Sequence, residues 1–351
     1  MKHVLRSLPG HLAFVLGTLV ATFLCVTQLS SFFYEGWGQV LSTATLSFLL
    51  SVLFVAVILA ALRWPRGGGL LLMAFALAGG SVWLWRQWAY DGLSAIVLTT
   101  AVVFFGPVLF LGVLFLLEAR HRRLLAAEEV RPPARWLARN YRSLVAVGIP
   151  VIAVAVISFQ RVPELLARHD DGLRGARRLE ANGVALVWAP AGPGWNQQLP
   201  SGGYPSWNEI ATYGSPPVGL KSSNVAPLPI VAADRMVQAG LCGYLNEDGT
   251  ALLSEPTHVW RLPTPDEVVR SLTKGGENAG CTMDARSPHA ACRVPPDKET
   301  PLWAPDQAPI YYWTSEAPDA THALGVNYTG GLTLHSKSSG AVGFRCVKPA
   351  R

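Results

Sequence analysis

Charged residues are scarce in this sequence and almost missing from the apolar runs of its first half. Only 15% of the 351 residues are Asp, Glu, Lys or Arg, and the longest apolar runs within residues 11–160 contain none. This composition excludes a water-soluble domain for the first half, because such a domain needs a charged surface. The net charge is +6, but much of it lies within residues 120–142 without any nucleic-acid-binding motif. We therefore expect no nucleic acid partner.

Five apolar stretches have the length and composition of membrane spans. A helix of about 20 apolar residues crosses the roughly 30 Å hydrocarbon core of a bilayer. The five stretches cover residues 11–34, 41–62, 69–85, 93–117 and 144–159. The last is the weakest, because it is short and contains Gly148 and Pro150. The sequence predicts an N-terminal all-α transmembrane bundle of about five helices over residues 1–160, with the lipid bilayer as its partner.

Basic residues favour every second loop between these stretches. Lys2 and Arg6 precede the first stretch, Arg63 and Arg66 follow the second, and the arginine-rich residues 120–142 follow the fourth. Positively charged loops stay in the cytoplasm. We expect a bacterial inner-membrane protein with a cytoplasmic N-terminus and a periplasmic or extracellular C-terminal domain. A cleaved signal peptide is the alternative for the first stretch, although its apolar run is longer than a usual signal core.

The predicted spans contain no Asp, Glu, Lys or Arg. Charged side chains inside a bilayer are the usual pointer to a transport pathway. The polar residues that are present, such as Thr18, Thr22, Thr27 and Thr99, can bond back to their own helices. Anchoring explains these features, and transport is the less favoured alternative.

The second half of the sequence differs from the first in how its apolar, charged and turn-forming residues are distributed. Residues 161–182 mix apolar and charged positions and are predicted to form an amphipathic juxtamembrane helix. Residues 183–351 alternate short apolar runs with turns rich in Gly, Pro, Ser and Asn, which indicates an α+β domain with long loops. A capping box of Thr264 and Glu267 marks one helix start. The other predicted elements are a helix at 232–245 and strands at 184–188, 310–314, 323–327, 332–335 and 341–347.

Four of the five cysteines lie in this second half, and an even number suits an oxidising compartment. Cys281 and Cys292 are close enough in sequence to clip one loop, and Cys242 could then pair with Cys346. The cysteine spacing matches no known zinc motif. We therefore predict disulfides, with free thiols or a metal site as alternatives.

Four short motifs resemble, in order, those of the formylglycine-generating (sulfatase-modifying factor) family. They are Val-Trp-Ala-Pro-Ala-Gly at 187–192, Trp-Arg-Leu-Pro-Thr at 260–264 followed by Glu267, Tyr-Trp-Thr-Ser at 312–315 and Gly-Phe-Arg-Cys-Val at 343–347. The resemblance covers roughly residues 183–348. It implies a variant of the C-type lectin fold, and the proposed disulfide pattern is also like that of C-type lectin domains.

The resemblance does not carry the family's oxidase chemistry with it. Those enzymes bind copper through a close cysteine pair shortly before the final strand, and residues 312–344 contain no cysteine. Family relatives that use non-heme iron bring histidine ligands from an added domain, whereas His258, His289, His322 and His335 are scattered here. A metal-dependent oxidoreductase of the formylglycine-generating or non-heme iron type is therefore the alternative hypothesis, and no catalytic residue is predicted.

The favoured hypothesis is a membrane-anchored binding or accessory module displayed outside the cytoplasm. Aromatic side chains in or beside loops could stack on a glycan, a peptide or a protein. The alternative is that they fill the core of a loop-rich domain. The acidic segment 297–306 could bind calcium, although it lacks a known calcium-loop pattern, and no other cofactor is predicted. The candidate ligand-binding residues are Trp195, Tyr204, Trp207, Trp303, Tyr311 and Tyr312.

Overall fold

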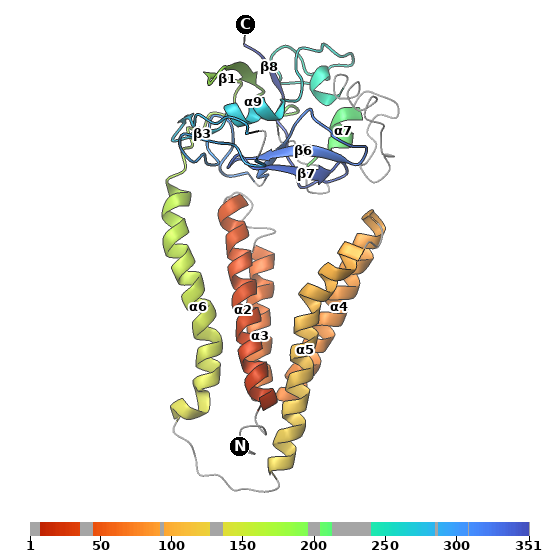
Figure 1. The fold of residues 1–351 in the computed structure, drawn as a ribbon, viewed down its shortest axis with the longest axis vertical. Coiled ribbons are helices and arrows are strands. Elements are labelled where there is room, and N and C mark those ends of the chain that lie inside the picture. The colour runs from red at the N-terminus through yellow and green to blue at the C-terminus, as the bar shows by residue number, and fades with distance from the viewer. Residues whose placement is uncertain are drawn as a thin grey trace. The chain divides into compact units, whose positions relative to one another are not determined.

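The computed structural model divides the chain into two compact units (Figure 1). It describes residues 8–35, 45–91, 95–126, 136–195, 204–212, 240–284, 287–307 and 309–350. The membrane unit comprises Met1–Phe33 and Val40–Pro163, and the C-terminal unit comprises Tyr34–Gln39 and Glu164–Arg351.

The described part of the membrane unit consists of helices. Its helices are α2 (Leu8–Glu35), α3 (Thr45–Arg63), α4 (Pro65–Asp91), α5 (Ala95–Ala126) and α6 (Trp136–Leu166). Four of them contain segments long and apolar enough to cross a membrane, and α3 contributes a shorter apolar segment within the described residues, Ser51–Arg63. The chain is therefore a membrane protein. The helices α2, α4 and α6 extend beyond their predicted spans at both ends and α5 at its C-terminal end, so that residues 120–126 and 136–142 of the arginine-rich stretch are helical rather than a loop.

Close backbone approach holds the helices α4 and α5 together. A Cβ atom added to Gly69 would lie 2.8 Å from the carbonyl oxygen of Gly112, and one added to Gly112 would lie 2.8 Å from that of Gly69. Small residues at such crossings let helices pack tightly in lipid, where the hydrophobic effect does not drive association. The hydroxyls of Thr18 and Thr22 bond to Phe14 O and Thr18 O, as predicted.

The predicted amphipathic helix over residues 161–182 is wrong. The helix α6 ends at Leu166, residues 167–176 are irregular, and β1 (Arg177–Ala181) follows. Two aspartates explain the break: Asp170 Oδ1 accepts from Gly172 N and Asp171 Oδ1 accepts from Leu173 N, each at 3.0 Å. Such local side-chain bonds offer the backbone an alternative to helical hydrogen bonds.

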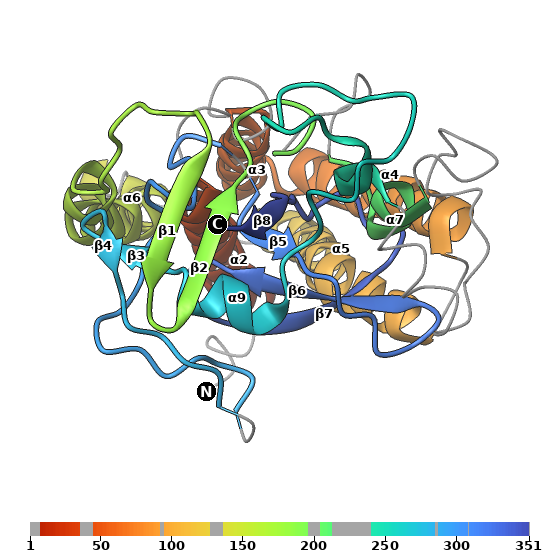
Figure 2. The same cartoon turned by 90° about the horizontal axis from the view of Figure 1, so that it is seen from above.

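The C-terminal unit has small antiparallel sheets joined by long connections (Figure 2). The first sheet has the order β1-β2-β8, so the first strands of the unit pair with the last. Its β1–β2 turn contains Asn182 and Gly183 at positive φ, the type I′ hairpin signal that the sequence carries. The strands after β1 are β2 (Val184–Trp188), β3 (Thr273–Lys274), β4 (Glu277–Asn278), β5 (Tyr311–Trp313), β6 (His322–Asn327), β7 (Leu332–Ser336) and β8 (Val347–Pro349).

The helices of this unit are short: α7 (Trp207–Thr212), η4 (Leu241–Tyr244) and α9 (Pro265–Arg270). The capping box of α9 is confirmed, because Thr264 Oγ1 accepts from Glu267 N at 3.2 Å and Glu267 Oε2 accepts from Thr264 N at 2.8 Å. The helix predicted at 232–245 is not found in its described part, which forms the 3₁₀ turn η4; residues 232–239 lie outside the described residues.

A single strand at 341–347 is also a wrong prediction. The backbone of this stretch changes partner every few residues: Gly343 N donates to Tyr311 O, Cys346 N to Gly194 O and Val347 N to Arg261 O. Only β8, from Val347 onward, belongs to a sheet. The last stretch of the chain therefore connects three segments, distant from one another in sequence, through backbone hydrogen bonds.

Candidate functional site

Five of the six aromatic side chains predicted to bind a ligand lie in the core. Trp195 and Tyr204 are buried, with 3% and 8% of their surfaces exposed, and Trp207, Trp303 and Tyr312 are fully buried. Only Tyr311 is partly exposed. Three of the rings contact one another: Trp303 stacks on Tyr312 with 3.7 Å between centroids, and Trp195 Nε1 donates to Tyr312 Oη at 2.7 Å. Buried rings cannot stack on an external ligand, so these five side chains build the core.

Arg345 lies at the centre of this core without any surface exposure. Its Nε donates to Ala189 O at 2.8 Å, its Nη1 donates to Pro301 O and Leu302 O, and its guanidinium lies 3.6 Å from the ring of Trp195. Desolvation lowers the pKa of Arg345 to about 9, and the group is still charged at neutral pH. The sequence indicated Arg345 only as part of a strand motif. It did not reveal that the side chain acts as a hub, that is, a buried group that binds backbone carbonyls of distant segments.

The acidic segment 297–306 is occupied by cationic side chains rather than arranged around a metal site. Asp297 accepts from Arg168 Nε at 3.0 Å and from Lys274 Nζ at 3.1 Å, and Asp306 pairs with Arg174. Because arginine and lysine already use these carboxylate oxygens, the segment does not fit calcium, which takes six to eight oxygen ligands. Within the described ranges, no three His, Cys, Asp or Glu side chains gather as metal ligands.

The same ion pairs fasten the segment after α6 to the C-terminal unit. Arg174 binds both carboxylate oxygens of Asp170, at 2.7 and 2.8 Å, and this hydrogen bonding lowers the pKa of Asp170. Asp171 N donates to Thr300 Oγ1 at 3.1 Å, while the Asp171 carboxylate pairs with Arg177. The irregular residues 167–176 and the start of β1 are thus held by ion pairs and hydrogen bonds rather than by a regular helix.

All four cysteines of the C-terminal unit are in disulfides. Cys242 pairs with Cys346 across 104 residues, and Cys281 pairs with Cys292 across 11 residues, as predicted. The remaining cysteine, Cys25, is buried in α2. The two bridges leave no thiolate pair in the C-terminal unit, where soft sulfur ligands would be needed for Cu(I).

The short bridge closes a protruding hairpin that we call the clipped loop, residues 279–294, described except for 285 and 286. Its two arms pair through Thr282 N to Ala291 O at 2.8 Å, Ala291 N to Thr282 O at 3.0 Å and Val294 N to Ala279 O at 3.2 Å. The Cys281 and Cys292 Cα atoms lie 3.9 Å apart between these pairs. The bridge therefore joins opposite positions of a two-stranded hairpin.

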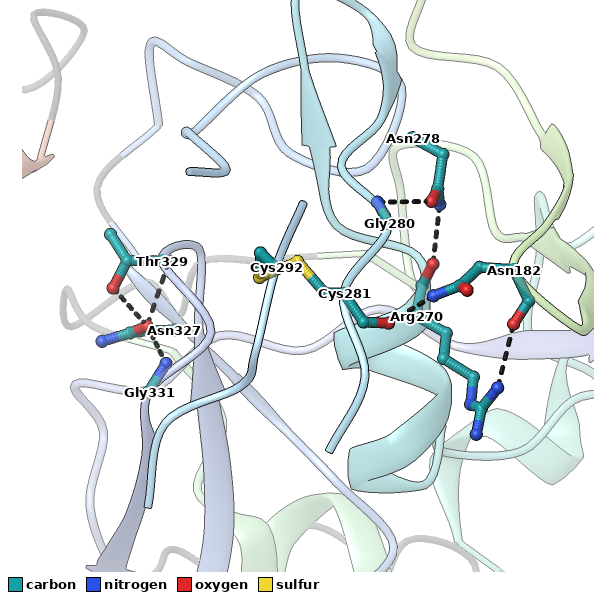
Figure 3. Close-up of a disulfide and its surroundings, with 9 residues drawn as sticks. All are labelled: Asn182, Arg270, Asn278, Gly280, Cys281, Cys292, Asn327, Thr329 and Gly331. Atoms are coloured by element: carbon teal, nitrogen blue, oxygen red, sulfur yellow. Dashed lines mark hydrogen bonds between the residues drawn. A yellow bond between two sulfur atoms is a disulfide. The ribbon is translucent and has the colours of Figure 1, made fainter. Parts of the chain in front are cut away.

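Side-chain hydrogen bonds fix one arm of the clipped loop at its root (Figure 3). The Asn182 amide donates to Cys281 O, and the Arg270 guanidinium donates to Asn182 O at 3.0 Å. Asn278 Nδ2 donates to Arg270 O at 2.7 Å, while its Oδ1 accepts from Gly280 N at 2.8 Å. The root is thereby tied to the β1–β2 turn and to the end of α9.

The other arm is anchored to the turn between β6 and β7. Asn327 Oδ1 accepts from Thr329 N at 3.0 Å and from Gly331 N at 2.7 Å, which shapes this turn (Figure 3). Ala290 N donates to Gly330 O at 2.9 Å. Both arms are thus held by hydrogen bonds to elements outside the loop.

The clipped loop exposes apolar side chains beside polar ones. Met283 and Val294 are 39% and 40% exposed, and Asp284, Pro288 and His289 are exposed as well. A cross-linked loop loses less conformational entropy on binding than a free one, so preorganisation favours recognition. Sequence reasoning proposed the disulfide but not the loop as a site; the 11-residue cysteine spacing was the available signal.

The four scattered histidines have separate surroundings. His322 Nδ1 lies 3.1 Å from the Asp319 carboxylate on the surface, whereas His335 packs against Tyr311 and Trp313 with centroids 4.6 and 5.8 Å apart. Burial lowers the pKa of His335. His289 belongs to the clipped loop, and His258 is exposed at positive φ.

Comparison with known proteins adds no family assignment. No protein-family model, no curated protein and no solved structure matches the chain.

Proposed function

We propose that this protein is a membrane-anchored binding or accessory module, with the clipped loop as its recognition element. One observation carries the proposal: the Cys281–Cys292 bridge and its braced root hold Met283, which is 39% exposed, in a preorganised hairpin. Exposed apolar side chains beside polar ones suit a protein or peptide partner better than a small polar ligand.

The proposed location is the bacterial inner membrane, with the N-terminus in the cytoplasm and the C-terminal unit in the periplasm or outside the cell. Two independent features support this orientation. Disulfides persist in oxidising compartments, and this unit contains two of them. The basic residues of the chain also favour the alternate loops that would then face the cytoplasm.

The sulfatase-modifying-factor resemblance remains part of the proposal for the fold alone. Its motifs supply structural residues here: Thr264 caps α9, Arg345 binds backbone carbonyls and Cys346 forms a bridge. Since the C-terminal cysteines are all paired, the copper oxidase chemistry of that family has no thiolate ligands in this unit. A fold of this type without its catalytic pair is consistent with binding.

The loop assignment is tested by comparing the proteins that co-purify with three forms of the full chain in detergent. Met283→Asp places a charge on the clipped loop, and Leu334→Asp places the same charge on exposed β7 of the same unit. We expect a protein bound by the wild type to be lost from Met283→Asp and retained by Leu334→Asp. An identical set of bound proteins for all three forms would refute the clipped loop as the recognition element.

The orientation needs a separate measurement. A reporter active only outside the cytoplasm, fused after Arg351, should give full signal, whereas a reporter active only in the cytoplasm should give none. The reverse pattern would overturn the proposed location together with the display model.

A further inference from the structure

Arg345 is a buried cation that no carboxylate of the described residues neutralises. Its Nε and Nη1 donate only to backbone carbonyls, which carry no net charge. No ion pair within the described part of the chain includes it. Its Nη2 is buried as well and finds no hydrogen-bond acceptor there. Buried charges in proteins are normally paired, so this guanidinium lacks the counter-charge that its burial calls for.

Three further buried N–H donors around Arg345 lack an acceptor among the described residues. They are Arg177 Nη1, Trp188 Nε1 and Trp303 Nε1. Trp188 and Trp303 are the sequence neighbours of residues whose carbonyls Arg345 binds. Arg177 lies directly opposite Trp188 in the β1–β2 ladder, so both side chains leave the sheet on the same face. We call Arg345 Nη2 and these three groups the orphaned donors.

Ring contacts place Trp303 in the same part of the core as Arg345. The Trp303 ring stacks on Tyr312, whose hydroxyl accepts from Trp195 Nε1. The Arg345 guanidinium in turn lies 3.6 Å from the Trp195 ring. The orphaned donors therefore belong to one continuous region beneath the β1-β2-β8 sheet.

This region is also electropositive. Desolvation lowers the pKa of Arg345, and the charges of Arg177 and Arg174 lower it further. Asp171 pairs with Arg177 through Nη2 at 2.7 Å, which leaves Arg177 Nη1 without a bond. The partner that suits such a region accepts hydrogen bonds and carries negative charge.

We propose that the orphaned donors hold a small monovalent anion, such as chloride, in the core of the C-terminal unit. Guanidinium and indole N–H groups only donate, which excludes a cation as the ligand. A water molecule could accept from two of the donors but would leave the charge of Arg345 uncompensated. Because all four donor atoms are buried, the site favours a small ion over a large oxyanion.

The test follows urea unfolding of the full chain in detergent by near-ultraviolet circular dichroism. The samples contain sodium chloride, sodium bromide or sodium gluconate at equal ionic strength. An anion that binds only the folded state raises the ratio of folded to unfolded protein, by about elevenfold at ten times its Kd. We expect chloride and bromide to raise the urea midpoint, whereas gluconate, a much larger anion, should not.

Three variants and a matched control assign this effect to the orphaned donors. Arg177→Gln removes a donor and a charge, and Trp188→Phe removes only an indole N–H from the same face. Arg178→Gln is the control, because Arg178 is the next residue of β1, on its other face, with 57% of its side chain exposed. Arg177→Gln and Trp188→Phe should weaken the apparent affinity for chloride at least fivefold, and Arg178→Gln should leave it unchanged. Arg345→Met should abolish the chloride dependence, and the two milder variants decide the matter if it fails to fold.

Two results would overturn the proposal. Equal urea midpoints of the wild type in chloride and gluconate would mean that no anion binds and that water serves these donors. An equal chloride dependence in Arg177→Gln, Trp188→Phe and Arg178→Gln would mean that the anion acts as a general salt on the protein surface.

Discussion

The membrane unit and the C-terminal unit differ in how far their hydrogen bonds reach along the chain. The helices of the membrane unit have 19 to 32 residues and satisfy most of their backbone groups internally. In the described part of the C-terminal unit, neither helices nor strands exceed six residues. There, the fold depends on contacts between distant segments, namely disulfides, buried cations and hydrogen bonds from side chains to the backbone. The comparison predicts that single changes in these long-range ties destabilise far more than equivalent changes in the membrane unit.

Removal of the long disulfide should have the largest effect on stability and is therefore the strongest test of that comparison. In the chain-entropy model, a cross-link that spans about 100 residues stabilises by about 4.7 kcal/mol, and one that spans 11 residues by about 2.8 kcal/mol. We therefore expect the double variant Cys242→Ala/Cys346→Ala to lose more stability than Cys281→Ala/Cys292→Ala. The measurement is the urea midpoint of the full chain in detergent, followed by near-ultraviolet circular dichroism.

The short bridge serves as the control in this experiment. Its Cys281 is buried among Trp188, Trp303 and Tyr312, whereas Cys242 and Cys346 are buried beside Trp207 and Phe344. Its loss should lower the urea midpoint less, because the loop that it closes is shorter. Equal losses for the two pairs would show that loop length does not govern the stability of this unit.

The membrane helices were predictable from the sequence because their cause is local. Apolar runs set the positions of the spans, and capping residues placed the start of α9 at Thr264. Both disulfides were predictable because few sensible pairings exist for four cysteines. The helix predicted through Asp170 and Asp171 failed, since nothing in its hydrophobic pattern revealed that these carboxylates cap their own turns.

The candidate site could be predicted only in part. Composition identified the aromatic residues around Trp195 and Trp303 as candidates. It did not show that they are buried, because burial depends on contacts with distant segments. The clipped loop depends on Asn182 and Asn327, whose roles follow from elements that meet only in the folded state. The sequence marks such residues as turn formers and is silent about their partners.

Arg345 provides the second test of the comparison. Arg345→Met keeps the apolar stem in the core but leaves the carbonyls of Ala189, Pro301 and Leu302 without their donor. Hydrogen bonds from charged groups contribute roughly 1.5–3 kcal/mol each, offset by the removal of a buried charge. We expect a net loss of about 2–4 kcal/mol in the same urea experiment.

The matched control is Arg178→Met. Arg178 pairs with Glu180 on the surface, with 57% of its side chain exposed. Exposed ion pairs contribute about 0–1 kcal/mol, so this variant should stay close to the wild type. Similar losses for the two variants would contradict the assignment of Arg345 as a hub.

A single hydroxyl tests the comparison across the two units. Thr264→Ala removes the cap of α9 and should lower the unfolding free energy of the C-terminal unit by about 1 kcal/mol. Thr27→Ala removes a hydroxyl that bonds back to Phe23 O within α2. That helix keeps its backbone bonds, and the expected change in thermal stability corresponds to less than about 0.5 kcal/mol. A larger effect for Thr27→Ala would reverse the comparison.

The smallest expected effect is a pH dependence confined to the C-terminal unit. Burial against Tyr311 and Trp313 lowers the pKa of His335 from 6.5, so the folded state favours the neutral ring. As the pH falls below about 6.5, the unfolded chain takes up this proton first, and the unfolding free energy decreases. His335→Gln should remove that part of the slope between pH 7 and 5, whereas His322→Gln, beside the exposed Asp319, should retain it. Urea midpoints measured at several pH values decide the matter: a slope unchanged in His335→Gln would mean that the pKa of His335 is the same in the folded and unfolded states.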